Sequence, residues 1–337
     1  MKVLVIRFSS IGDILLTTPV LRCLKKQLNA EVHFLTKGGN VELLYNNANV
    51  DKVVVLQDSM RQTVSALKKE SYDAVVDLHN NHRSRYVRRR LRVKSYVYRK
   101  ENVSKWLTIM TKHSFMSGLH VVDRYLKAVA PLGVKDDGGG LEINLPEELK
   151  SDALKLKNIS GKNVSDLTGV PYVVIACGAQ HATKRIPLEK IMVVSSLIRA
   201  KVVLLGDKTD KTRIRNWEGS FGGNVVNLCG KTTLLESAAL INGASAVVTP
   251  DSAMMHFAAA LHRPVIAVWG ATIPDFGFSA FRTWHVDCEV NNLWCRPCSR
   301  MGSGRCPLGH LNCMHNQNWQ SIAEAASKMA ENNGSQN

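Results

Sequence analysis

The first carboxylate placed to do chemistry is Asp13, within FSSIGDILLTTP at residues 8–19. The small residues Ser9, Ser10 and Gly12 predict a turn, and the apolar spacing that follows places Asp13 at the start of a helix. A carboxylate there can take a proton from an acceptor hydroxyl, as a general base does. The alternative is a helix-start acid that only binds free N–H groups, and spacing alone favours that alternative.

A second polar group follows the first predicted strand of the C-terminal half. The segment CGAQHATKRIP supplies the hydroxyl, ammonium and guanidinium groups of Thr183, Lys184 and Arg185, which suit a diphosphate. It is not a P-loop, and the chain has no G-x-G-x-x-G fingerprint. After the next strand, LGDKTD ends at Asp210, whose carboxylate can hold ribose hydroxyls or act as a plain turn acid.

A third group lies in TPDSAMMHFAAALHRPVIAVWGAT, residues 249–272. A strand ends before Asp251 and Ser252, and a helix is predicted to begin at Ala253. The free N–H groups and dipole of such a helix start favour a phosphate. His256 follows about one turn later, on the ligand side. The alternative is that Asp251 and Ser252 are only capping residues.

Five of the eight cysteines crowd into residues 288–313. The spacing Cys295-x2-Cys298-x7-Cys306-x6-Cys313 can close a tetrahedral structural zinc site. A reduced thiol cluster and a redox-labile staple are the alternatives. Nothing in the pattern indicates a catalytic metal.

Alternating strands and helices position these groups. The series predicts two doubly wound parallel-sheet domains, because βα units repeat on both sides of a polar, glycine-bearing stretch at 133–172. We place the N-terminal domain at 1–160, the C-terminal domain with its cysteine-rich loop at 161–316, and a helix that can cross back at 317–330. Strands are predicted at 2–6, 31–35, 52–56, 73–78, 172–176, 201–205, 225–228, 246–249 and 264–269, and helices at 13–28 and 60–69.

Charge points to an anionic partner. The 337 residues carry a net charge of +16, and nine basic residues fall between His82 and Lys100. Nucleic acid, an anionic membrane face and a phosphorylated lipid would each be attracted; a solvated helix face is the alternative. The N-terminal apolar stretch is interrupted by polar residues and lacks a cleavage site, so we expect a cytoplasmic protein.

Three motifs in register resemble one family. IRFSSIGDILLTTPVLRCLKK, the segment Lys184-Arg185-Ile186-Pro187 and PDSAMMHFAAALHRPVIAVWGAT are similar, in this order and spacing, to the heptosyltransferases of lipopolysaccharide core synthesis, in glycosyltransferase family 9. The likeness runs over nearly the whole chain and includes DLHNNHRS at 77–84 and the cysteine-rich segment at 295–314.

The resemblance implies the GT-B fold, with two Rossmann-like domains facing across a cleft. The acceptor would bind the N-terminal domain and the nucleotide sugar the C-terminal one. The implied reaction transfers heptose from ADP-heptose, with inversion and without a catalytic metal, to the Kdo and heptose inner core on lipid A.

The resemblance also implies roles for individual residues. Asp13 would be the general base, with Ser10 and Gly12 beside the acceptor. Lys184 would hold the donor phosphates and stabilise charge on the leaving ADP. The other donor contacts would be Thr183, Arg185, Asp210, Asp251, Ser252, Ala253 and His256. Residue 253 is alanine where the family usually has glycine, and its Cβ limits how closely the backbone can approach phosphate.

Arg83 and Arg85 come soonest after the strand that carries Asp77, so they are the expected acceptor contacts. Lipid A phosphates and Kdo carboxylates at the inner face of the inner membrane would require such a basic surface. The protein would then be peripheral at that face.

Two other functions stay open. A GT-B enzyme that moves a different sugar would have nearly the same nucleotide site, since fold does not fix substrate. A polyanion- or nucleic-acid-binding protein could use the basic segment and a zinc module. Against it, the arginines are barely interleaved with aromatics and no nucleic-acid motif is present, so no nucleic-acid partner is expected.

Overall fold

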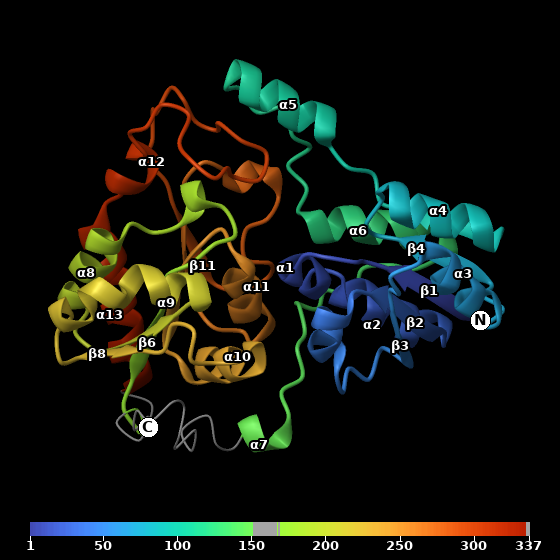
Figure 1. The fold of residues 1–337 in the computed structure, drawn as a ribbon, viewed down its shortest axis with the longest axis horizontal. Helices are drawn as coiled ribbons and strands as arrows, with labels where there is room; N and C mark the ends of the chain where they lie inside the picture. The colour runs from blue at the N-terminus through green and yellow to red at the C-terminus, as the bar shows by residue number, and fades with distance from the viewer. Residues whose placement is uncertain (151–166, 168, 335–337) are drawn as a thin grey trace. The chain divides into compact units, whose positions relative to one another are not determined.

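The computed structural model describes residues 1–150, 167 and 169–334 (Figure 1). The chain divides into two compact units. Unit 1 comprises Met1–Asn102 and Leu119–Asn144, and unit 2 comprises Val103–Gly118 and Leu145–Asn337. The predicted domain boundary at 160/161 lies outside the described residues.

Unit 1 is built on five parallel strands in the order β3-β2-β1-β4-β5. The strands are β1 (Lys2–Ile6), β2 (Glu31–Thr36), β3 (Lys52–Val55), β4 (Ala74–Asp77) and β5 (Lys94–Val97). The helices are α1 (Ile11–Leu15), α2 (Thr18–Leu28), α3 (Met60–Lys68), α4 (His82–Leu91) and α6 (Val121–Val129), with 3-10 turns η1 (Gly38–Leu44) and η2 (Ala130–Leu132).

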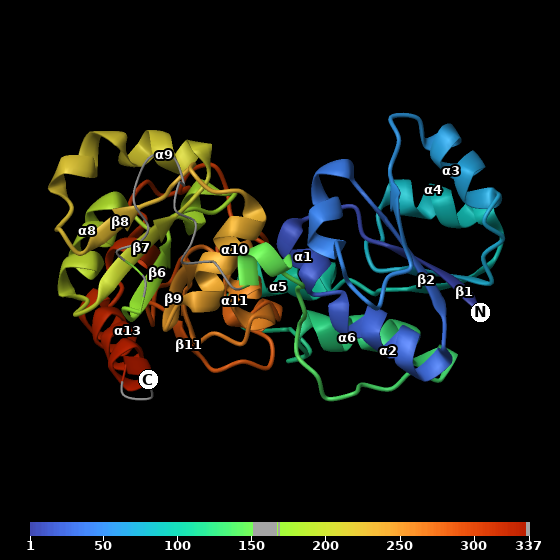
Figure 2. The ribbon, with the colours of Figure 1, turned by 90° about the horizontal axis from the view of Figure 1, so that it is seen from below.

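Helices cover both faces of this sheet, so its central strands can be apolar throughout. Figure 2 shows α3 and α4 on one face and α2 and α6 on the other. Leu4 and Ile6 of β1 pack on the first face in a buried cluster with Val64 and Leu67 of α3 and Val87 of α4.

Unit 2 holds six parallel strands in the order β11-β10-β9-β6-β7-β8. The strands are β6 (Tyr172–Ala176), β7 (Lys201–Leu205), β8 (Val225–Asn227), β9 (Ala246–Pro250), β10 (Val265–Val268) and β11 (His285–Cys288). The helices are α5 (Asn102–Thr111), α7 (Glu147–Lys150), α8 (Leu188–Leu197), α9 (Lys208–Ile214), α10 (Leu234–Gly243), α11 (Ala253–Ala260), α12 (Asn312–His315) and α13 (Trp319–Gly334), with 3-10 turns η4 (Ala182–Lys184), η5 (Arg215–Ser220) and η6 (Pro274–Phe276).

The C-terminal helix is part of the core of unit 2. Ile322 and Ala326 of α13 are buried in one cluster with Ile191 and Val194 of α8 and with inward side chains of β6 and β7. Within the part of the chain that the structure describes, no helix combines the length and apolar character needed to cross a bilayer.

All nine predicted strands are confirmed, with each end within one residue, but the single helix predicted at 13–28 is wrong. It is two helices, α1 and α2, with Pro19 in the first turn of α2. Proline has no N–H to continue the ladder. The hydroxyls of Thr17 and Thr18 instead donate to the carbonyls of Ile14 and Leu15.

The strand order locates the sites. In each sheet, successive strands are added on one side of the first strand until the edge is reached, and the next strand is then added on the other side of the first. This reversal of strand order occurs between β1 and β4 in unit 1 and between β6 and β9 in unit 2. Ligands of such sheets bind beyond the carboxyl ends of the strands at this switch point. The segments that carry Asp13, Lys184 and Asp251 follow β1, β6 and β9 and so lie at these switch points, whereas the loop with Asp210 follows β7.

Candidate active site

Asp13 lies at the switch point of unit 1, in the first turn of α1. Its carboxylate accepts hydrogen bonds from the Ser10 backbone N–H at 3.1 Å and the Ser10 hydroxyl at 2.7 Å. It also forms an ion pair with Arg7 at 2.7 Å, yet its side chain is 19% exposed. The carboxylate is thus fixed on one side and open to solvent on the other, while Gly12 is buried in the helix.

Arg7 fixes this geometry from the end of β1. Its guanidinium donates to the Ser9 carbonyl at 2.7 Å, the Leu78 carbonyl at 2.6 Å and the Tyr125 hydroxyl at 2.9 Å. Burial disfavours the charged form of Asp13, but Arg7 and the Ser10 hydrogen bonds outweigh it and lower the pKa of Asp13. Asp13 is therefore ionised at neutral pH, as a general base must be.

Two neighbours of this carboxylate, Arg7 and His79, were not predicted from the sequence. The ring of His79 packs on Phe8 at 5.2 Å between centroids. Burial, together with the charges of Arg7 and Lys100, lowers its pKa to about 4, so His79 is neutral. Both residues follow strands that meet at the switch point, which is the signal that could have found them.

The basic segment forms α4 and the residues after it. Arg88 has a structural role, because its guanidinium forms an ion pair with the buried Asp77 carboxylate at 2.8 Å. Arg83 and Arg85 are exposed, and neither forms an ion pair with any residue in the described ranges. They are therefore available to an anionic ligand.

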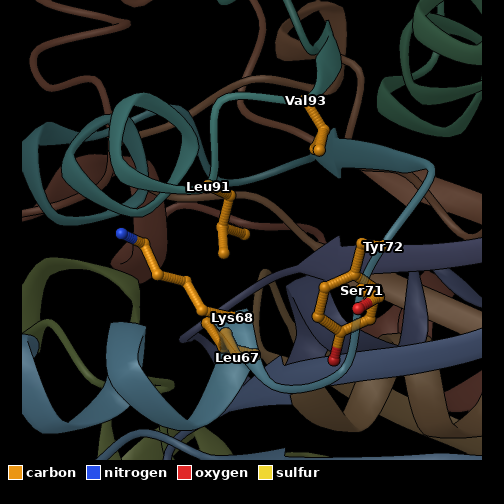
Figure 3. Close-up of a pocket in the computed structure, with 6 residues that line it drawn as sticks. All are labelled: Leu67, Lys68, Ser71, Tyr72, Leu91 and Val93. Carbon is orange, nitrogen blue, oxygen red and sulfur yellow. The ribbon is translucent and has the colours of Figure 1, made fainter.

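Unit 1 also contains a small pocket at a distance from Asp13 (Figure 3). It is about 90 Å³ in volume and is lined by Leu67, Lys68, Ser71, Tyr72, Leu91 and Val93. Tyr72 and Val93 precede β4 and β5, so the pocket lies at the amino ends of the strands. Its volume is below the roughly 300 Å³ of small ligand sites, and its position is opposite to Asp13.

The switch point of unit 2 brings together two segments that are far apart in sequence. The Lys184 ammonium, after β6, forms an ion pair with Asp251, after β9, at 2.6 Å. The Thr272 hydroxyl, after β10, donates to the same carboxylate oxygen at 2.7 Å. The structure thus joins Lys184 and Asp251, which the sequence offered only as separate candidates.

The N-terminus of α11 adjoins this pair. Ser252 occupies the N-cap position but makes no side-chain cap bond; its hydroxyl lies 3.1 Å from that of Thr249. Ala253 and Met254 supply the first helical N–H groups, and both residues are partly exposed. An uncapped helix start beside a lysine is suited to a phosphate. His256, one turn on, is only 4% exposed.

The cysteine-rich loop packs over Lys184. The Ser303 backbone N–H donates to the buried Thr183 hydroxyl at 2.8 Å. Gly302 has φ +95°, and a Cβ there would lie 2.8 Å from Cδ of Lys184. Arg296 anchors the loop by donating to the Gly270 carbonyl at 2.6 Å and the Thr272 carbonyl at 2.9 Å. Because the Thr183 hydroxyl is hydrogen-bonded to Ser303, it is directed toward this loop.

Asp210 does not present its carboxylate to solvent. It is 2% exposed, accepts from the Asp207 backbone N–H at 3.1 Å and pairs with Arg213 at 2.7 Å. Gly178 and Gly206 leave room for it, since a Cβ at either would clash with it. The carboxylate of Asp210 is therefore not accessible for the direct ribose contact that was predicted from the sequence. Arg185 donates to the Ala179 carbonyl at 2.8 Å and braces the same loop.

The four cysteines of the predicted zinc site all carry free thiols. Cys295 Sγ lies 3.9 Å from His310 Nε2. Burial raises the pKa of Cys298 and, to about 11, that of Cys313; the other cysteine charges act in the same direction. In the described ranges, no three His, Cys, Asp or Glu side chains are grouped closely enough to hold a metal.

Solved structures share this fold. The structure titled E. coli ADP-heptose lps heptosyltransferase II aligns with a TM-score of 0.76 at 19% identity, over 99% of each chain. E. coli heptosyltransferase WaaC with ADP aligns with a TM-score of 0.67 at 19% identity, over 98% of this chain and 100% of the other. The two parallel-sheet units thus have the GT-B fold of these structures.

The family model for glycosyltransferase family 9 (heptosyltransferase) matches residues 60–307, and the chain belongs to that family. Lipopolysaccharide heptosyltransferase 3 of Escherichia coli is 28% identical over 281 residues, which cover 77% of this chain and 81% of that protein. Lipopolysaccharide heptosyltransferase 1 of Campylobacter coli is 23% identical, over 84% of this chain and 87% of its own length.

Proposed function

We propose that the protein transfers heptose from ADP-heptose to the inner core of a lipopolysaccharide precursor, with inversion. The observation that carries the proposal is the Lys184–Asp251 pair beside the uncapped start of α11, at the switch point of unit 2. Family membership and heptosyltransferase relatives support the reaction class.

The donor diphosphate would bind the first N–H groups of α11, and the Lys184 ammonium would turn to it from Asp251. An ammonium there stabilises the charge that develops on the ADP oxygen as the glycosidic bond breaks. Asp251 would stay fixed by Thr272 and could accept a sugar hydroxyl. Asp210 and Thr183 would act indirectly, by holding the loops that carry these groups.

Asp13 would be the general base. The acceptor hydroxyl oxygen forms a bond to the anomeric carbon, the bond from that carbon to the β-phosphate oxygen breaks, and the hydroxyl proton passes to Asp13. Attack from the face opposite the leaving ADP inverts the anomeric centre. In this scheme no step needs a metal ion.

Arg83 and Arg85 would bind acceptor phosphates or carboxylates, because they are exposed cations in the acceptor-binding unit. A lipid-borne acceptor places the enzyme at the inner face of the cytoplasmic membrane. Double substitution Arg83→Ala/Arg85→Ala should raise the acceptor KM and leave ADP affinity unchanged.

A structural zinc on Cys295, Cys298, Cys306 and Cys313 would require the thiols to draw together from the arrangement described. Metal content per chain tests it. One zinc per chain that is lost in Cys298→Ser would support the site. Metal-free protein with full activity would mean that Ser303 and Arg296 hold the loop without it.

Nucleotide binding by calorimetry tests the donor assignment. We expect ADP to bind more tightly than UDP or GDP, and Lys184→Ala to weaken ADP about ten- to a hundredfold, since it removes a charge-assisted contact. Lys328→Ala, at an exposed position on α13, is the control. Preference for UDP or GDP would move the function to another nucleotide sugar, and binding of none would contradict a transferase.

A further inference from the structure

Helix α5 exposes an apolar face that the proposed chemistry does not use. Val103, Trp106 and Met110 lie on one side of the helix at spacings of three and four residues, and Phe115 follows it. Trp106 is 55% exposed and Met110 63%. Solvent-exposed apolar residues grouped in this way indicate an interaction surface.

The opposite side of α5 is fixed to unit 2. The Lys105 ammonium lies 5.0 Å and 4.6 Å from the ring centroids of Phe276 and Phe278. After the helix, the Lys112 ammonium donates to the Pro297 carbonyl at 2.8 Å. These contacts leave the Trp106 side outward, and they bring α5 next to the cysteine-rich loop (Figure 1).

The loop adds to the same surface. Trp294 is 73% exposed. It directly precedes Cys295, whose carbonyl accepts a hydrogen bond from the Lys112 ammonium at 3.4 Å. We call Val103, Trp106, Met110, Phe115 and Trp294 the α5 patch. Two tryptophans and a phenylalanine beside Val103 and Met110 match the residues that enter a membrane interface.

The two segments that carry the α5 patch are basic. Residues 103–118 and 290–317 contain no Asp or Glu, while they contain Lys105, Lys112, Arg296, Arg300 and Arg305. Of these, Lys112, Arg300 and Arg305 are exposed. Such a surface is complementary to anionic lipid headgroups. A second copy of the chain docked by the same face would meet its own positive charge.

We infer that the α5 patch docks unit 2 onto an anionic bilayer, with Trp106 and Met110 in the interface and the cations on the headgroups. This deepens the proposed function and rests on it in one respect, since a lipid-borne acceptor gives the docking its purpose. The docking itself is a physical property of the surface and can be measured without donor or acceptor.

Flotation of the full chain with lipid vesicles tests the inference. Wild type should float with vesicles of phosphatidylcholine mixed with phosphatidylglycerol and much less with phosphatidylcholine alone. Trp106→Ser/Met110→Ser should lower the partition coefficient by about tenfold or more, because two apolar side chains no longer enter the interface. Added salt should weaken binding of both proteins.

The matched control is Val193→Ser/Leu197→Ser, which removes two exposed apolar residues at the same spacing from α8. It should float as wild type does. The inference would be overturned if wild type did not float with anionic vesicles, or if the α5 variant still floated as wild type does. It would also be overturned if the α8 variant lost vesicle binding to the same extent as the α5 variant. ADP binding by the same proteins reports the donor site separately, so failure of docking and failure of the proposed function are distinguishable.

Discussion

Asp13 shows how one carboxylate can be both buried by its neighbours and ready to accept a proton. Arg7 and Ser10 hold it ionised, since they outweigh the cost of burial and lower its pKa. A base with a lowered pKa is weaker, but it is in the correct protonation state over the whole neutral range. Replacing it by Asp13→Asn should reduce kcat by about 10²–10⁴, with ADP affinity retained.

The pH profile of kcat/KM tests the role of Ser10. Activity that needs the carboxylate is lost as pH falls through the pKa of Asp13. Ser10→Ala removes the hydroxyl that donates to Asp13 at 2.7 Å, so the pKa of Asp13 should rise and the acidic limb should move to higher pH. Ser10 is exposed, so the variant should fold normally.

The matched control is Ser9→Ala, which leaves the bonds of Asp13 to Ser10 intact and should leave the acidic limb in place. An acidic limb that does not move in Ser10→Ala would show that a group other than Asp13 governs it.

At single residues the sequence was informative where spacing and residue type agree. Asp13, Lys184 and Asp251 were predicted as candidates, and each lies at the carboxyl end of a strand. The partner relations were not predictable, because the Lys184–Asp251 pair joins positions 67 residues apart whose approach depends on strand order. Asp210 was predicted to contact the ribose, but its carboxylate is buried between two glycine turns. A loop motif in the sequence does not indicate such burial.

Among the elements, the central strands were predictable, as were the edge strands β3 and β8, but the edge strands β5 and β11 were not. β1, β6 and β7 are continuous apolar runs, as strands covered on both faces should be. β5 was missed because KSYV sits at the sheet edge inside a basic segment, and β11 because HVDC alternates polar with apolar residues. α5 was missed because its outward face is apolar, which violates the usual amphipathic pattern.

The cysteine-rich loop acts as an element that positions Lys184, and Gly302 is its point of contact. A methyl group at Gly302 would lie 2.7 Å from Cβ of His181 and 2.8 Å from Cδ of Lys184. Gly302→Ala should therefore displace the lysine and weaken ADP binding several-fold, in addition to about 1 kcal/mol of backbone strain at its positive φ. Calorimetry and thermal unfolding measure the two effects.

Gly309→Ala separates strain from contact. Gly309 also has a positive φ, +75°, but no atom lies within 4 Å of a Cβ built there. It should lose similar stability and keep its ADP affinity. If both variants bound ADP equally, the loop would not position Lys184.

At the level of the whole molecule, the two units can be followed separately by spectroscopy. All six tryptophans, at 106, 217, 269, 284, 294 and 319, belong to unit 2. Tryptophan fluorescence therefore reports the unfolding of unit 2, whereas far-ultraviolet circular dichroism reports helices of both units. This distinction assigns ligand binding to a unit without any mutation in unit 1.

ADP should stabilise unit 2 if its site is the one at β6/β9. A ligand at about 100 times its Kd adds about 2.7 kcal/mol to the unit that binds it. The midpoint of the tryptophan transition in urea should therefore rise with ADP in wild type and rise much less in Lys184→Ala. A rise in the circular dichroism transition with no change in tryptophan fluorescence would place the nucleotide on unit 1, and the proposed division between donor and acceptor units would then be wrong.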